Sequence, residues 1–133
     1  MLERKILVVD DEPAILAVMK EIFKMGGYAV STAERAEEAL KILSQEIFLV
    51  MLLDLKLPDM NGIELCKRIR RDNLVAIIYA FTGYTNFYGL LDCRTAGFDD
   101  FFVKPVDTKM LLKAAEDAFE KLERWKVDEF DLA

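Results

Sequence analysis

Five short apolar runs alternate with amphipathic stretches along the 133-residue chain. Each run is continuous rather than alternating in polarity, as expected for strands that a parallel sheet buries on both faces. Strand-helix alternation repeated five times predicts right-handed crossovers and an α/β, doubly wound, three-layer domain. The runs are Ile6–Val9, Tyr28–Val30, Phe48–Leu53, Val75–Phe81 and Phe101–Val103.

The stretches between the runs repeat apolar residues at helical spacing. Pro13 suits the first turn of the first helix, and Gly26-Gly27 suits its end. Asp107-Thr108 are candidate caps of the last helix. The fourth helix, around residues 87–96, is the weakest prediction, because Gly89 falls inside it. One domain is expected over residues 1–126, followed at 127–133 by an acidic and apolar tail or the start of a linker.

Composition narrows the classes of function. With 53% apolar residues the chain can bury a substantial core, and a net charge of −6 argues against a nucleic-acid-binding face. No apolar run is long enough for a signal or membrane segment. Cys66 and Cys93 have no Cys-x-x-Cys spacing and are expected to be small core residues in a reducing cytoplasm.

The chain contains no histidine. This excludes histidine-based nucleophilic sites, histidine general bases and histidine-ligated metals within the chain. Any phosphohistidine donor must therefore be a different molecule or domain.

Polar residues end four of the five apolar runs. Ligand sites in open α/β sheets gather at the carboxyl ends of the strands, where the strand order reverses. With a strand order of 2-1-3-4-5, the ends of strands one, three, four and five would meet, and the second strand would contribute nothing. The polar strand ends are Asp10-Asp11, Asp54, Thr82 and Lys104-Pro105.

The residue types at these strand ends indicate a chemistry. Three carboxylates close together repel, so a cation is expected among them, and hard oxygen ligands favour Mg²⁺, with Mn²⁺ as an alternative. An aspartate can also be a nucleophile that forms an acyl phosphate. A lysine ammonium and a hydroxyl, here Lys104 and Thr82, would stabilise the negative charge of an incoming phosphoryl group.

This pattern resembles the receiver domain of two-component response regulators. The resemblance covers the chain from about Lys5 to about Lys126 and implies a flavodoxin-like fold. The matching segments are VVDDEPAI at 8–15, LLDLKLPDMNGIEL at 52–65, FTG at 81–83 and DDFFVKPVD at 99–107.

The resemblance implies a metal site and a phosphate acceptor. Asp54 matches the phosphoacceptor and also a metal ligand. Asp10 and Asp11 match the acidic pair that holds Mg²⁺, with Asp11 the more direct ligand. The backbone carbonyl of Lys56 matches a third protein ligand.

Three further residues match by the same resemblance. Lys104 matches the lysine that pairs with Asp54 or the phosphoryl oxygens. Thr82 matches the hydroxyl that turns towards the phosphate. Pro105 matches a proline preceded by a cis peptide bond, so the Lys104-Pro105 bond is expected to be cis.

The family's mechanism sets the expected partners. A bacterial sensor histidine kinase or a histidine phosphotransfer domain would supply the phosphoryl group, and the domain would catalyse only its own phosphorylation and slow dephosphorylation. Thr82 would move towards the phosphate and Phe101 inward, changing the surface of the fourth helix, fifth strand and fifth helix for a downstream effector. A phosphorylation-dependent dimer is also expected as an option.

Three positions depart from the family's usual pattern. Phe101 stands where a tyrosine is common, which keeps the packing but removes a hydroxyl. The segment 84–89 is unusually aromatic, so Tyr84 and Phe87 are either packing residues or part of a partner-binding face. Lys56 and Tyr84 flank the expected route of the attacking water, and the direction of their effect on phosphate lifetime stays open.

Two rival functions are weighed. A receiver-fold interaction module that ignores phosphate would not need the acidic pair, Thr82 or Lys104. A small enzyme on a similar sheet is the other rival. A haloacid-dehalogenase-type phosphatase needs a second aspartate at the position of Lys56, and a flavodoxin needs a phosphate loop where residues 10–13 are acidic. The output of the domain, and whether the chain is a stand-alone regulator, stay open.

Overall fold

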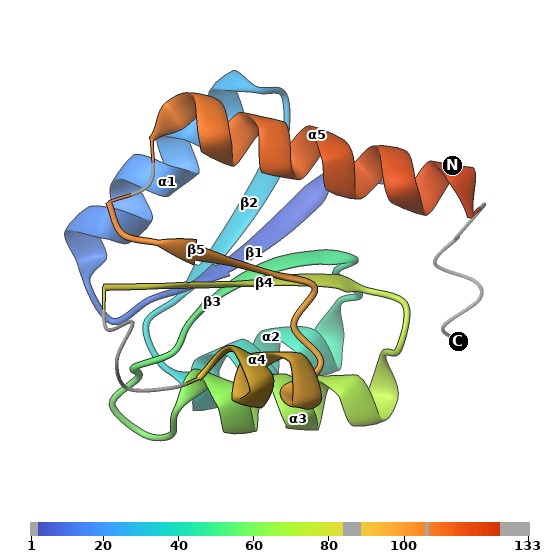
Figure 1. The fold of residues 1–133 in the computed structure, drawn as a ribbon. Coiled ribbons are helices and arrows are strands. Elements are labelled where there is room, and N and C mark those ends of the chain that lie inside the picture. The colour runs from blue at the N-terminus through green and yellow to red at the C-terminus, as the bar shows by residue number, and fades with distance from the viewer. Residues whose placement is uncertain (1–2, 84–88, 106, 126–133) are drawn as a thin grey trace.

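A computed structural model describes residues 3–83, 89–105 and 107–125, and these form five strands and five helices (Figure 1). The strands are β1 (Lys5–Val9), β2 (Ala29–Ala33), β3 (Val50–Asp54), β4 (Ile77–Thr82) and β5 (Asp100–Val103). The helices are α1 (Pro13–Met25), α2 (Ala36–Gln45), α3 (Gly62–Asp72), α4 (Leu90–Ala96) and α5 (Thr108–Arg124).

The strands form one parallel sheet in the order β2-β1-β3-β4-β5. Helices α1 and α5 cover one face, and α2, α3 and α4 cover the other (Figure 1). The structure thus confirms the three-layer, doubly wound fold and its strand order. Because the order reverses beside β1, the carboxyl ends of β1 and β3 lie next to each other.

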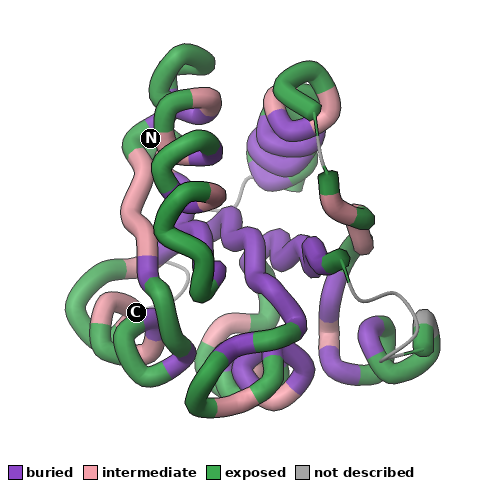
Figure 2. The backbone as a smooth tube through the Cα atoms, turned by 90° about the vertical axis from the view of Figure 1, so that its left-hand side faces the viewer, coloured by how far each residue is buried: buried purple, intermediate pink, exposed green. Residues whose placement is uncertain are grey.

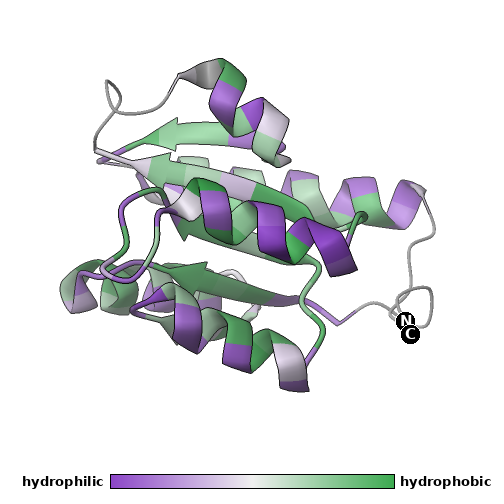
Figure 3. Cartoon of the chain, turned by 90° about the horizontal axis from the view of Figure 1, so that it is seen from below, coloured by the Kyte–Doolittle hydropathy of each residue, from purple (hydrophilic) through white to green (hydrophobic). Residues whose placement is uncertain are grey.

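Each face of the sheet has its own apolar core. Alternate residues of one strand point to opposite faces, so Val8 packs in the α1/α5 core and Val9 in the α2/α3/α4 core. The central strands are buried along their length, whereas the outer helix faces are exposed (Figure 2). Coloured by hydropathy, the helices show both hydrophilic and hydrophobic residues along their length, as amphipathic helices do (Figure 3).

All five strands differ at one or both ends from the predicted runs, and β3, for example, begins at Val50 rather than Phe48. β2 begins at Ala29 and runs on to Ala33 because it is an edge strand, where polar residues such as Thr32 are tolerated in the ladder. Tyr28 lies outside β2 and is buried, with its ring stacked on Phe119 at a centroid distance of 5.4 Å. β4 begins at Ile77, and Val75 lies before it, 38% exposed.

Both ends of α1 and the start of α5 follow the predicted local signals. α1 begins at Pro13 and is capped by Gly26, and the side chain of Asp107 accepts a hydrogen bond from the N–H of Met110 at the start of α5. The prediction that Gly89 lies inside the fourth helix is wrong, because Gly89 is the N-cap of α4 and precedes the helix. Its conformational freedom therefore costs α4 nothing.

Several other expectations concern the ends and the core. Cys66 and Cys93 are both free and buried, as expected. The tail at 127–133 lies outside the described residues. In the part of the chain that the structure describes, no helix combines the length and the apolar character that a bilayer crossing requires.

The junction between β3 and α3 has room for glycine alone. A Cβ atom on Gly62 would overlap the backbone oxygen of Asp54 and lie 2.8 Å from the Cα atom of Leu55. We expect Gly62→Ala to lower the free energy of unfolding by about 2–3 kcal/mol, because backbone atoms must move to admit the methyl group. Urea unfolding followed by circular dichroism measures the loss.

Gly83 provides the matched control. Among the described residues other than its neighbours in the chain, none has an atom within 4 Å of a Cβ placed on Gly83. Gly83→Ala should change the free energy of unfolding by less than about 0.5 kcal/mol. Equal losses for the two substitutions would contradict the steric explanation.

Candidate functional site

Lys104 stands between two buried carboxylates at the carboxyl edge of the sheet. Its Nζ atom lies 2.7 Å from Oδ2 of Asp10 and 3.2 Å from Oδ2 of Asp54. Asp10 directly follows β1, Asp54 ends β3, and Lys104 directly follows β5. Parallel pairing brings these strand ends to one edge, so the structure assembles there residues that are far apart in the sequence.

The remaining oxygen of each aspartate binds a backbone N–H group. Oδ1 of Asp10 accepts from the N–H of Glu12 at 2.9 Å, and Oδ1 of Asp54 accepts from the N–H of Lys56 at 3.2 Å. The side chain of Asp10 is fully buried, and that of Asp54 is 5% exposed. Both carboxylates are therefore fixed in orientation by the backbone on one side and by Lys104 on the other.

Burial and the neighbouring charges shift the pKa values of Asp10 and Lys104 in opposite directions. Burial raises the pKa of Asp10 above its usual value, and the hydrogen bonds from Lys104 and Glu12 offset only part of that rise. For Lys104, burial alone lowers the pKa, but the bonds and charges of Asp10 and Asp54 raise it overall. The lysine is thus held in its charged form next to the two carboxylates.

The acidic loop after β1 gathers three possible metal ligands. One oxygen each from Asp10, Asp11 and Glu12 lie within 4.8 Å of one another. Oε1 of Glu12 also lies 3.8 Å from Nζ of Lys104. Glu12 was not among the predicted site residues, although its place in the acidic run was a signal for it. Oxygen donors of this kind suit Mg²⁺.

The predicted switch residues lie on neighbouring strands. Thr82 ends β4 and is buried, and its backbone oxygen accepts from the N–H of Lys104 at 2.9 Å. Phe101 lies in β5, half-buried against the α2/α3/α4 core. The Lys104-Pro105 peptide bond is cis. Tyr84 and Phe87 fall outside the described residues.

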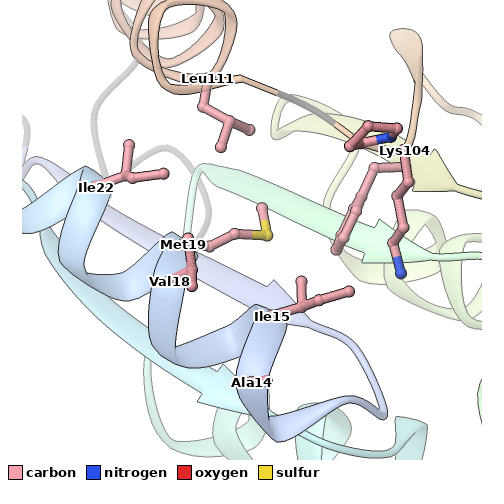
Figure 4. Close-up of a pocket in the computed structure, with 9 residues that line it drawn as sticks. Ala14, Ile15, Val18, Met19, Ile22, Lys104 and Leu111 are labelled. Atoms are coloured by element: carbon pink, nitrogen blue, oxygen red, sulfur yellow. The ribbon is translucent and has the colours of Figure 1, made fainter.

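An apolar groove of about 510 Å³ runs between α1 and α5 to Lys104 (Figure 4). The side chains of α1 that line it include Ile15, Val18 and Ile22, and Leu111 lines it from α5. Ile15 and Ile22 are only half-buried, and Val18 is 58% exposed.

Comparison with known proteins identifies the class to which this fold and site belong. The sequence model of the response regulator receiver domain matches residues 6–132. The chain belongs to this family, and it is a receiver domain of the two-component response regulators. Receiver domains bind Mg²⁺ at the acidic pocket formed by their strand ends.

Two curated relatives are regulatory proteins. The chain is 36% identical over 104 residues to the alkaline phosphatase synthesis transcriptional regulatory protein PhoP of Bacillus subtilis, covering 78% of this chain and 43% of that protein. It is 34% identical over 122 residues to the nisin biosynthesis regulatory protein NisR of Lactococcus lactis, covering 92% of this chain and 53% of that protein. The chain thus spans about half the length of the curated relatives it matches.

Solved structures share the whole fold. A CheY-like response regulator receiver domain protein from Methanospirillum hungatei superposes with a TM-score of 0.88 at 33% identity, covering 92% of this chain and 98% of that one. The beryllofluoride-activated NtrC4 receiver domain dimer superposes with a TM-score of 0.83 at 28% identity, covering 89% of this chain and 98% of that one.

The raised pKa of Asp10 predicts how stability depends on pH. The folded state holds this proton more tightly than the unfolded state, so the free energy of unfolding falls as pH rises from the usual pKa of 3.8 through the raised folded value. An asparagine at this position does not titrate. Asp10→Asn should therefore gain a relative stability advantage over the wild type as pH rises through that window.

Urea unfolding in EDTA, followed by circular dichroism at several pH values between 3.5 and 7, measures this advantage. Subtracting the wild-type free energy of unfolding from that of the variant cancels the contributions of the carboxyl groups that the two proteins share. An advantage that stays constant or shrinks with rising pH would show that burial does not dominate at Asp10.

Proposed function

We propose that this receiver domain accepts a phosphoryl group on Asp54 from a partner phosphohistidine. The observation that carries the proposal is the setting of the Asp54 carboxylate. One oxygen faces the Lys104 ammonium at 3.2 Å and the other faces the Lys56 N–H at 3.2 Å. A carboxylate oriented in this way is ready for nucleophilic attack, and a cation lies beside it to stabilise negative charge.

A divalent cation completes this chemistry. Asp10, Asp11 and Asp54 with the backbone carbonyl of Lys56 would hold Mg²⁺, and Glu12 lies close enough to Asp10 and Asp11 to act with them. The all-oxygen donor set fits this ion, and Mn²⁺ would be accepted on the same grounds. When bound, the ion supplies positive charge next to the oxygens of the phosphoryl group.

The chain's own residues act on the transferred group in the following way. An oxygen of Asp54 attacks phosphorus as the bond from phosphorus to the donor's imidazole nitrogen breaks, and the donor leaves with that electron pair. Lys104 neutralises the phosphoryl oxygens, and the hydroxyl of Thr82 turns towards them. Slow hydrolysis of the acyl phosphate later restores the Asp54 carboxylate.

The output follows from packing between neighbouring strands. When Thr82 turns towards the phosphate, it vacates space beside β5, and Phe101 moves inward to fill it. The surface of α4, β5 and α5 then changes shape for an effector, or for a second receiver domain in a phosphorylation-dependent dimer. A receiver domain dimer among the solved relatives and two regulatory proteins among the curated relatives support these kinds of partner.

The donor is a sensor histidine kinase or a histidine phosphotransfer domain in this proposal. The apolar groove between α1 and α5 leads to Lys104, so it provides a surface beside Asp54 for such a partner. A phosphate-independent interaction module is less well supported. It would gain nothing from two buried carboxylates paired with a lysine, because burying those charges costs stability.

Incubation with acetyl phosphate and Mg²⁺ tests the proposal. Intact-protein mass spectrometry should show the addition of one phosphoryl group to the wild-type chain. Asp54→Asn should abolish the addition, because an amide oxygen is too weak a nucleophile. EDTA should reduce the initial rate by at least about a hundredfold, because the charge that the cation neutralises is left unpaired.

Asp72→Asn is the matched control, because Asp72 is an exposed carboxylate at the end of α3. It should be phosphorylated like the wild type. If no donor adds phosphate to the wild type, or if Asp54→Asn is phosphorylated equally well, the proposed function is wrong.

A further inference from the structure

The β3–α3 loop is closed at its base next to Asp54. The N–H of Gly62 donates to the oxygen of Leu55 at 2.9 Å, and Lys56 and Asn61 form an antiparallel bridge. Lys56 is also the residue whose N–H binds the Asp54 carboxylate. Movement of this loop would therefore displace the Lys56 peptide group.

The tip of this loop is tied to a helix from another part of the chain. Oδ1 of Asp59 accepts from the N–H of Ala36 at 2.9 Å, and Oδ2 accepts from the N–H of Glu37 at 2.8 Å. These are the first two N–H groups of α2, whose own N-cap residue, Arg35, makes no side-chain capping bond. Asp59 thus caps α2 from a distance of more than twenty residues in sequence.

The same start of α2 is joined to the acidic loop. The backbone oxygen of Ala33, at the end of β2, accepts from the N–H of Asp10 at 3.0 Å. Between Ala33 and Glu37 the chain therefore makes contact with both loops that carry the proposed Mg²⁺ ligands. One contact is to Asp10, and the other, through Asp59, is to the loop of Lys56.

We propose that Asp59 is a positioning residue that sets the spacing between the two ligand-bearing loops by anchoring the β3–α3 loop to the start of α2. This inference rests on the proposed function, because it assumes that the Lys56 carbonyl and the acidic pair hold Mg²⁺. It also assigns a role to the β2 end, which delivers no polar side chain to the site but holds both loops through its backbone and the helix that follows.

The charge of Asp59 suits this position. Burial alone raises the pKa of its carboxyl, but the N–H groups of Glu37 and Ala36 outweigh that and hold the pKa below its usual value. The carboxylate is therefore ionised at neutral pH and lies at the positive end of the α2 dipole. Because Asp59 is exposed overall, its replacement leaves the two apolar cores intact.

Titration of the chain with Mg²⁺ alone, followed by the backbone amide signals of residues 54–62 in NMR, tests the inference without any phosphodonor. We expect Asp59→Ala to bind Mg²⁺ about tenfold more weakly than the wild type, because outer residues that orient metal ligands have effects of this size. An unchanged dissociation constant would overturn the inference.

A recapped variant separates positioning from stability. Arg35 has the extended backbone of an N-cap, with φ −150° and ψ 160°, so Arg35→Ser should cap α2 locally. In the double variant Asp59→Ala with Arg35→Ser, the midpoint of thermal unfolding should return to the wild-type value while Mg²⁺ binding stays weak. If Mg²⁺ affinity returns together with stability, Asp59 acts only as a cap and the inference is wrong.

A charge control completes the design. Glu38→Gln removes an exposed carboxylate from the first turn of α2 without touching the Asp59 bonds. It should weaken Mg²⁺ binding by less than twofold. A loss equal to that of Asp59→Ala would show that the Asp59→Ala effect comes from net charge alone.

If the wild type itself shows no Mg²⁺-dependent shifts and accepts no phosphate, the proposed function fails. Normal wild-type binding with an unaffected Asp59→Ala variant overturns the positioning role alone.

Discussion

The contact of the Lys104 ammonium with Asp10 and Asp54 is the interaction on which the rest of this molecule depends. Two carboxylates buried at adjacent strand ends would repel each other and lose their hydration, and the Lys104 ammonium close to both offsets these costs. The strand order provides for this. β1 and β3 lie side by side, and the lysine that follows β5 reaches back across the end of β4. The chemistry and the sheet are thus parts of one arrangement.

Lys104 also lies between the two faces of the molecule. Its ammonium is 5.0 Å from the ring centroid of Phe81, which belongs to the α1/α5 core, and the groove between those helices ends at the lysine. Phe101 packs on the opposite face, against the α2/α3/α4 core. A change at Asp54 is therefore close to an open groove on one side and to the packing of β5 on the other, which is the geometry that a signalling domain requires.

The loops that carry the site are anchored to the segment between β2 and α2. The N–H of Asp10 donates to the oxygen of Ala33, and the N–H groups at the start of α2 donate to the Asp59 carboxylate, so both loops are connected to the segment between β2 and α2. A separate network fixes the far end of the sheet, where the guanidinium of Arg70 donates to the oxygens of Gly97 and Ala76 and pairs with Asp99 at 2.8 Å. Loops anchored in this way at the carboxyl edge of the sheet favour ligands that are already in position.

The sequence by itself determined the layers and the polar residues Asp10, Asp54, Thr82 and Lys104 at the strand ends, because continuous apolar runs and the residues that end them are local features. Their meeting at one edge follows from the strand order, which was assumed from the sequence and is confirmed by the structure. Tertiary structure decided the rest. The extent of β2 follows from its edge position, and the place of Gly89 from where α4 begins. The Asp59 cap, the cluster with Glu12 and the groove beside Lys104 depend on contacts between segments or on the fold of a loop, and no periodic pattern records those.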